Sequence, residues 1–167
     1  QLGDGTSTNR DTPTKVGTST SWTAIDAGRY FTCARHSSGS LYCWGYNNYG
    51  QLGDGTETDR DTPTKVGTST SWTSVSAGAD HACARYTSGS LYCWGYNGGA
   101  QLGTGDYTSR LSPTKVGIST SWTSITTGRL HTCALHSTGN AYCWGANNVG
   151  QLGLGDTTNR TAPTKIP

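Results

Sequence analysis

Apolar and polar residues alternate in short runs along the chain, and glycine or hydroxyl-bearing residues close each run. In the first third, SWTAIDAG (Ser21–Gly28) and FTCARH (Phe31–His36) follow this pattern, and LYCWGYN (Leu41–Asn47) returns after a Ser-Ser-Gly turn. Alternation of this kind predicts β-strands, and the last two segments predict a hairpin. A fourth extended segment, PTKV (Pro13–Val16), opens after a polar loop. No stretch keeps the periodicity of a helix, so an all-β fold is expected.

The pattern recurs with a fixed period of 50 residues. QLGDG begins at Gln1 and Gln51, QLGTG at Gln101 and QLGLG at Gln151, and PTK follows in all four copies. We therefore read residues 1–167 as a single array. It comprises repeat one (1–50), repeat two (51–100), repeat three (101–150) and a partial fourth repeat (151–167). Four short strands per repeat are typical of propeller blades. The sequence predicts a partial β-propeller, or propeller-like array, of about three four-stranded blades.

The order of motifs in each repeat resembles the regulator of chromosome condensation repeat. PTKV is followed by W-x-x-[IV]-x-x-G, then C-A-x-x-x-x-G-x-x-Y-C-W-G-x-N, then G-Q-L-G-x-G, and the densest part is CWGYNNYGQLGDG (Cys43–Gly55). The resemblance covers the whole chain and implies propeller blades. Members of that family typically close a ring of seven blades, and many lack the paired cysteines. The chain thus resembles a secreted, bacterial-like variant with a disulfide in each repeat.

The six cysteines form three pairs, each ten residues apart: Cys33 and Cys43, Cys83 and Cys93, Cys133 and Cys143. A hairpin folded symmetrically about Ser38 places the first pair directly opposite one another, close enough for a disulfide. We expect one such bond per repeat, each worth about 2 to 3 kcal/mol. Three structural disulfides favour an extracellular or periplasmic location, for a secreted protein.

Two alternatives for the cysteines remain open at this point. Buried free thiols are one. A zinc site is the other, because His81 and His131 stand two residues before a cysteine and imidazole with thiolate suits zinc. Phe31 occupies the same position in repeat one and cannot bind a metal. We therefore expect no metal and no cofactor.

Tryptophan also occupies fixed repeat positions, namely Trp22, Trp72 and Trp122 at one and Trp44, Trp94 and Trp144 at another. Rows of aromatic rings can bind sugars by stacking. Regular placement beside cysteine and glycine in strands favours packing between blades instead, because each ring buries a large apolar area.

The glycine-rich QLGDGT loop lacks the spacing of a phosphate-binding loop. Asp4 and Asp54 would suit calcium, but Thr104 and Leu154 replace them in the later repeats. We expect these glycines to provide backbone conformations with positive φ.

No catalytic set emerges from the titratable residues. The only glutamate is Glu57, so no glutamate base can recur from repeat to repeat. His36 and His136 follow the first cysteine strand into its turn, where we expect solvent-exposed side chains. An enzyme is not expected.

Substitutions between the repeats gather in two loops, where a propeller presents binding surface. The candidate binding-loop residues are Arg29, Tyr30, Phe31, Tyr49, Asp80, His81, Tyr107, Arg129 and Leu130. The alternative, that loops simply tolerate change, stays open. Asn159, in Asn-Arg-Thr, is the only N-glycosylation acceptor pattern.

Composition limits the classes of partner. Only 13% of residues are charged and the net charge is +2, which gives no electrostatic reason to expect nucleic acid or an anionic membrane. No apolar run is long enough for a membrane-spanning helix, and no secretory leader pattern is present. The chain begins inside a repeat, so we expect a processed or partial piece of a longer product.

These observations favour a non-enzymatic extracellular repeat module for protein interaction or for structural assembly, as a ring or fibre. Its partners would be further copies of the chain or more blades of a longer one. Residues 1–17 are expected to complete a blade begun elsewhere, and residues 151–167 to start another. The resemblance offers two alternatives. One is a secreted propeller that binds or inhibits a specific protein, such as a hydrolase. The other is a guanine-nucleotide exchange factor, which disulfides and the missing blades disfavour.

Overall fold

The computed structural model describes residues 1–167, and all of its regular secondary structure is β-strand. The strands form three four-stranded antiparallel sheets, which we call blades 1, 2 and 3. Blade 1 contains β1 (Trp22–Ala27), β2 (Phe31–His36), β3 (Leu41–Gly45) and β4 (Arg60–Lys65). Blade 2 contains β5 (Trp72–Ala77), β6 (His81–Tyr86), β7 (Leu91–Gly95) and β8 (Arg110–Lys115). Blade 3 contains β9 (Trp122–Thr127), β10 (His131–His136), β11 (Ala141–Gly145) and β12 (Arg160–Lys165). The expected fold class is confirmed.

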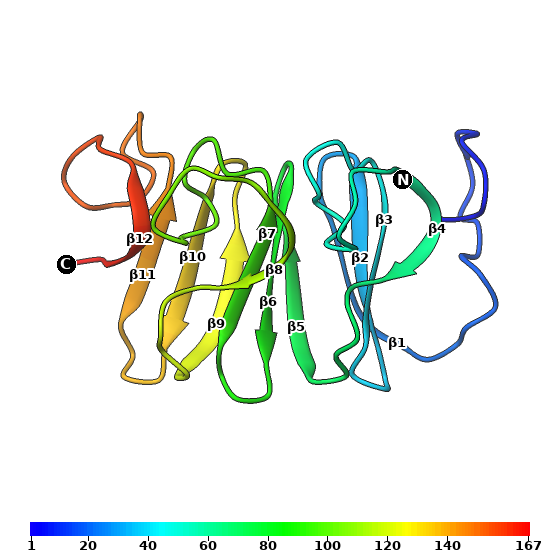
Figure 1. The fold of residues 1–167 in the computed structure, drawn as a ribbon, viewed down its shortest axis with the longest axis horizontal. Helices are drawn as coiled ribbons and strands as arrows, with labels where there is room; N and C mark the ends of the chain where they lie inside the picture. The colour runs from blue at the N-terminus through cyan, green and yellow to red at the C-terminus, as the bar shows by residue number, and fades with distance from the viewer.

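The blades stand side by side in chain order (Figure 1). Within each blade the strands follow one another across the sheet, and the fourth strand is its outer edge. The first strands of successive blades are in contact, β1 with β5 and β5 with β9. The arrangement is therefore that of neighbouring propeller blades around an inner row of first strands. No segment forms a helix with the length and apolar character that crossing a bilayer requires.

The sheets are out of phase with the 50-residue sequence repeat. Each blade takes three strands from one repeat and its fourth from the next, as β4 (Arg60–Lys65) does by pairing with β3. This corrects one expectation: residues 151–167 supply β12 and complete blade 3, rather than starting another blade. Pro13–Val16, expected to be extended and strand-forming, lies outside the strands, because the strand that would pair with it is not among residues 1–167.

The predicted hairpins and disulfides are confirmed. In blade 1, Cys33 pairs directly with Cys43 across β2 and β3, with a Cα–Cα distance of 4.1 Å. Cys83 with Cys93 and Cys133 with Cys143 repeat this geometry, and no cysteine is free. All three bonds lie inside a single blade. They therefore hold each hairpin together without joining one blade to another.

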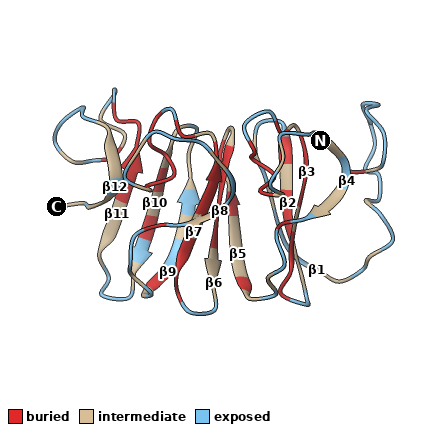
Figure 2. Cartoon of the chain, viewed as in Figure 1, coloured by how far each residue is buried: buried red, intermediate tan, exposed pale blue.

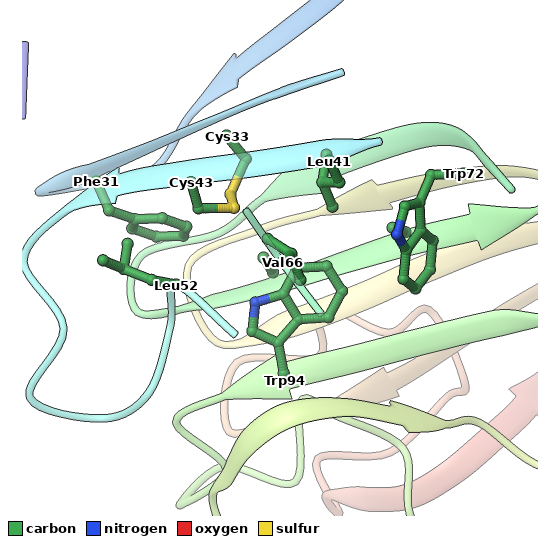
Figure 3. Packing of buried hydrophobic residues seen from close by; sticks show 10 residues of the cluster. Phe31, Cys33, Leu41, Cys43, Leu52, Val66, Trp72 and Trp94 are labelled. Atoms are coloured by element: carbon green, nitrogen blue, oxygen red, sulfur yellow. A yellow bond between two sulfur atoms is a disulfide. The ribbon is translucent and has the colours of Figure 1, made fainter. Parts of the chain in front are cut away.

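The hydrophobic core lies between blades as well as within them (Figure 2). One cluster joins residues of blade 1 to Trp72, Ala82, Ala84 and Trp94 of blade 2, and Figure 3 shows Trp94 beside Phe31, Leu52 and Val66. A second cluster joins blade 2 to blade 3 in the same way. The predicted packing role of the tryptophans is confirmed for five of them, which are at most 4% exposed; Trp22, on the end blade, is half-buried.

Candidate functional site

Each blade has two different faces. We call the face toward the next blade the trailing face and the face toward the preceding blade the leading face. In blade 1 the trailing face carries the disulfide and aliphatic side chains, and its members in the interface are Phe31, Cys33, Leu41, Cys43, Leu52 and Val66. In blade 2 the leading face carries tryptophans and alanines, namely Trp72, Ala82, Ala84 and Trp94, with Val75 packed against them. The two faces pack together into one buried cluster, and the same pairing recurs between blades 2 and 3.

Hydrogen bonds reinforce the contact between blades. On the trailing face of blade 1, Arg35 Nε donates to the Trp72 carbonyl at 2.6 Å, and Arg85 Nη1 donates to the Trp122 carbonyl at 3.3 Å at the next interface. Near the inner strands, Asp26 Oδ2 accepts the Ala77 backbone N–H at 2.9 Å. Polar groups at the rim thus fix the position of the apolar centre.

The QLG-x-G segments act as clasps that reach from one blade to the next. Gln51 follows β3 of blade 1, yet its carbonyl accepts the indole N–H of Trp94 on blade 2 at 3.0 Å. Gly53 lies so close to the same ring that a Cβ there would be 2.6 Å from its Nε1. Gly53 and Gly55 have φ of 69° and 85°, so the expected positive-φ role is confirmed.

One buried polar pair is specific to the second interface. His81 of β6 is fully buried, and its Nε2 lies 3.0 Å from Thr132 Oγ1 on blade 3. Since the Thr132 hydroxyl donates to the Gln101 carbonyl at 2.8 Å, it accepts from a neutral imidazole protonated on Nε2. Burial, followed by repulsion from His131, lowers the pKa of His81 to about 3.

Sequence reasoning missed the buried asparagine that organises each clasp. Asn47 Nδ2 donates to the carbonyls of Thr56 and Thr58, both at 3.0 Å, and its Oδ1 accepts the Leu52 N–H at 2.9 Å. Asn97 and Asn147 occupy the same position. Identity at this position in all three repeats was the available signal.

The clasp also holds an Asp–Arg ion pair, which the sequence comparison concealed. Asp54 binds Arg60 at 2.8 Å, whereas in later repeats the acid moves by two positions and Asp106 binds Arg110 at 2.6 Å. Thr104 therefore replaces the earlier aspartate without loss of the pair. Partial burial raises the pKa of Asp54, but hydrogen bonds from Thr56 and Arg60 together outweigh it, so the pKa lies below its ordinary value.

The candidate binding-loop residues divide into two groups. Phe31 and His81 are corrected: both begin a strand and are at most 1% exposed, because they pack into the interface with the following blade. Arg29 and Arg129 are exposed and line one shallow hollow shared by the first turns of all three blades. Asp80 and Leu130 each follow a lining residue in the sequence and are half-buried. Tyr107 is 55% exposed on the clasp loop of blade 2.

Tyr30 and Tyr49, from two different loops, are brought together on one surface. Tyr46 lies between them, with ring centroids 6.3 Å from Tyr30 and 6.5 Å from Tyr49. Tyr49 in turn lies 4.9 Å from Tyr96 of blade 2, and Arg29 lies over Tyr30 at 4.8 Å. Tyr30 and Tyr49 are 44% and 41% exposed. We call Tyr30, Tyr46, Tyr49 and Tyr96 the tyrosine row.

Three further candidates behave as structural residues. His36 and His136, expected to be exposed turn side chains, are half-buried, because each closes a strand and packs edge-on against Trp22 or Trp122. Asn159 is half-buried, and its Oδ1 accepts the Asn147 N–H at 2.9 Å. Glycosylation of its amide nitrogen stays a prediction.

The two end faces of the array resemble the internal interfaces without a neighbouring blade. On the leading face of blade 1, Ile25 is 68% exposed, although the equivalent Val75 packs into an interface. On the trailing face of blade 3, Leu135 is 47% exposed beside Ala141 and Ile166. Burial lowers the pKa of His131 on that face.

Comparison with known proteins identifies the repeat. Two family models described as the regulator of chromosome condensation (RCC1) repeat match the chain, one at residues 38–85, 88–135 and 138–167 and the other at 22–51, 72–101 and 122–151. No curated protein matches.

Solved structures share the fold at low sequence identity. Human WBSCR16 is similar at 24% identity and a TM-score of 0.79, over 87% of this chain and 38% of that one. Yeast RCC1 (Prp20), solved bound to Kap60, is similar at 23% identity and a TM-score of 0.79, over 87% of this chain and 37% of that one. The ectodomain of the receptor kinase CR4 from Physcomitrella patens reaches 24% identity and a TM-score of 0.51, over 75% of this chain and 30% of that one. The chain thus spans less than two fifths of the length of these structures.

Proposed function

Since this chain belongs to the regulator of chromosome condensation (RCC1) repeat family, we propose that it is a non-enzymatic, extracellular or periplasmic module that binds protein through its blade faces. In this role the three blades form a rigid block whose two ends take part in assembly with further blades. The partner is a protein surface of matching shape.

The observation that carries this proposal is the chemistry of the two end faces. A terminal repeat that only caps an array presents a polar outer face. Here Leu135 occupies the position of Arg35 and Arg85, so the end face of blade 3 lacks the charge that the internal trailing faces carry at this position. A contiguous apolar face of this kind marks a protein interaction site.

The similar structures support a protein partner in general terms. Yeast Prp20 was solved bound to Kap60, and a second Prp20p structure was reported with its binding properties to Gsp1p and histones. Because this chain spans less than two fifths of those proteins, we carry over only the class of partner. The three disulfides support the proposed location, since such bonds persist in oxidising compartments.

The tyrosine row favours a second candidate, binding of one specific protein target on the side of blades 1 and 2. Tyrosine and arginine are enriched in the residues that dominate binding energy, and Arg29 flanks Tyr30 here. Tyr30→Ala and Tyr49→Ala would abolish such binding without altering the end faces.

Photo-crosslinking separates the two candidates. A photoreactive residue in place of Leu135, or of Tyr49, is exposed to the secreted proteins of the source organism and to the chain itself. The end-face proposal expects a protein adduct from position 135, and the second candidate expects one from position 49. Absence of any adduct from position 135 would contradict the end-face proposal. The same reagent at exposed Thr138, in the β10–β11 turn, is the matched control.

A further inference from the structure

Tyr49, on the loop after β3 of blade 1, and Tyr96, at the end of β7 of blade 2, place two phenol rings against each other across a blade boundary. Their ring centroids lie 4.9 Å apart, with 54° between the ring planes. Aromatic rings at this separation are in van der Waals contact. Since each disulfide stays inside one hairpin, a bond between these two rings would join neighbouring blades in a way that no disulfide does.

The same two positions at the next boundary hold Gly99 and Ala146. A Cβ on Gly99 would lie 3.5 Å from the Ala146 Cβ, so these positions also face each other. One boundary therefore pairs two phenols where the other pairs two of the smallest residues. Because blades 2 and 3 form their buried cluster without aromatic rings at this place, packing of the blades does not by itself require the two tyrosines.

The side chains that an oxidant in solution can reach are mainly tyrosines. Thiols and methionine thioethers are common targets of oxidation, but the chain has no methionine and no free cysteine. Five of the six tryptophans are at most 4% exposed, and Trp22 is half-buried. The phenols of Tyr30, Tyr49 and Tyr107 are more exposed, at 44%, 41% and 55%.

The tyrosine row connects two of these exposed phenols with the boundary. Tyr46 lies 6.3 Å from Tyr30 and 6.5 Å from Tyr49, between ring centroids, so an electron can pass from ring to ring along the row. Tyr49 and Tyr96 are the closest pair in it. We propose that Tyr49 and Tyr96 are a site of dityrosine formation, at which hydrogen peroxide acting through a haem peroxidase joins blade 1 to blade 2. This modification goes beyond the proposed function and depends on neither candidate partner.

The reaction removes one hydrogen atom from each phenol. Each hydroxyl gives its electron to the peroxidase and its proton to solvent, which leaves two phenoxyl radicals with unpaired density on the ring carbons beside the oxygen, Cε1 and Cε2. One such carbon of Tyr49 bonds to one of Tyr96. The hydrogen on each bonded carbon then moves to the oxygen and restores both phenols. Two phenols and one peroxide thus give one dityrosine and two waters.

The contact in the folded chain favours coupling within one molecule. Both rings are held by the same chain, so the concentration of one around the other does not fall when the protein is diluted. An exposed side chain such as Tyr49 also changes rotamer within nanoseconds, which lets its ring turn an edge carbon toward Tyr96. Tyr107 has no aromatic neighbour among the ring pairs of the structure and can couple only between chains.

Peptide mapping tests the site directly. The full chain, with its disulfides intact, is treated at micromolar concentration with hydrogen peroxide and a haem peroxidase, then reduced and digested with trypsin. Cleavage after lysine and arginine places Tyr49 in peptide 36–60 and Tyr96 in peptide 86–110. We expect a fluorescent conjugate of these two peptides, lighter than their sum by two hydrogen atoms, with the bond at Tyr49 and Tyr96. Its yield per chain should stay constant on dilution.

Conservative variants separate this pair from the other tyrosines. Tyr49→Phe and Tyr96→Phe should each abolish the conjugate, because the ring remains but forms no phenoxyl radical. Tyr107→Phe is the matched control and should leave the yield unchanged.

Gly99→Tyr with Ala146→Tyr, added to Tyr49→Phe, should move the bond to the next boundary and give a conjugate of peptides 86–110 and 130–160. If this triple variant does not fold, the two single phenylalanine variants decide the question.

The inference is overturned if no conjugate of peptides 36–60 and 86–110 forms while Tyr107 couples between chains. It is also overturned if the conjugate persists in Tyr49→Phe, or if its yield per chain falls in proportion to dilution, which would show that the bond joins different molecules.

Discussion

His81 on blade 2 and Thr132 on blade 3 share a 3.0 Å contact inside the array, and the imidazole is fully buried. An unfolded chain takes up a proton at this histidine near its ordinary pKa of 6.5, whereas the folded chain does so only near a pKa of about 3. Between these values the unfolded state binds more protons, so stability falls as pH falls from about 6.5 toward 3. His81 alone contributes at most about 1.4 kcal/mol per pH unit to this slope, and His131, whose pKa burial also lowers, adds to it. Urea unfolding at a series of pH values measures it.

The variant His81→Phe with Thr132→Ala should flatten this slope, because it removes the titratable imidazole. It leaves an apolar pair like Phe31 and Ala82, which are buried at the equivalent positions between blades 1 and 2. The aspartates act at lower pH, because Asp54 and Asp106 have pKa values below their ordinary 3.8 and their effect on stability begins only below about pH 5. An unchanged slope between pH 6 and about pH 5, which lies between the two pKa values of His81, would show that His81 does not cause it.

Gly53 and Gly67 separate steric clash from backbone strain. Both have positive φ, 69° and 57°, but a Cβ at Gly53 would lie 2.6 Å from Trp94 Nε1 and one at Gly67 would meet nothing within 4 Å. Gly67→Ala should cost about 1 kcal/mol from strain alone. Gly53→Ala should cost a further 1 to 3 kcal/mol, roughly the cost of overpacking. Thermal unfolding of the two variants side by side measures the difference, and equal losses would contradict the clasp.

Trp72 and Trp22 occupy the same repeat position in different surroundings. Trp72 is 3% exposed between two blades, whereas Trp22 is half-buried on the end face. Trp72→Ala should therefore lower the free energy of unfolding by about 3 to 5 kcal/mol. Trp22→Ala should cost clearly less under conditions where the chain is monomeric. Denaturant titration tests this, and a larger loss at Trp22 would argue against packing between blades as the source of stability.

Each disulfide closes a ten-residue separation and should contribute about 2 to 3 kcal/mol. Cys83→Ser with Cys93→Ser should lower stability by this amount, and reduction of the wild type should lower the midpoint of thermal unfolding. Titration of the denatured, unreduced chain should find no free thiol. Six titratable thiols would refute the bonds.

Much of the fold was predictable because the local signals agree with one another. The ten-residue spacing of Cys33 and Cys43, the turn between them and the alternation on both sides all require the same hairpin register. The repetition of Trp94 and its equivalents indicated packing between blades. Which repeat supplies the fourth strand of each sheet was not predictable in the same way. Arg60–Lys65 pairs with a strand from the preceding repeat, and its own sequence carries no signal for that partner.

The candidate site was harder to predict, because variation between repeats has two causes. Tyr30 and Tyr49 vary because they are exposed, whereas Phe31 and His81 vary because each matches a residue on the next blade. Tyr30 and Phe31 are adjacent and both differ between the repeats, so the sequence alone does not tell these two causes of variation apart. Only the position of the neighbouring blade separates a surface residue from a matched interior pair.

The confinement of every disulfide to one hairpin has a mechanical consequence. A pull on the two ends would load the blade boundaries, which no covalent bond other than the backbone crosses, and the blades would come apart one after another. The hairpin loops closed by Cys33–Cys43 and its equivalents, each with a sequence separation of 10, would stay closed under that load. Each repeat would then release only the roughly 40 residues outside its loop, about 140 Å of chain at ~3.5 Å per residue. Under tension the array would behave as an extensible tether that lengthens in equal steps.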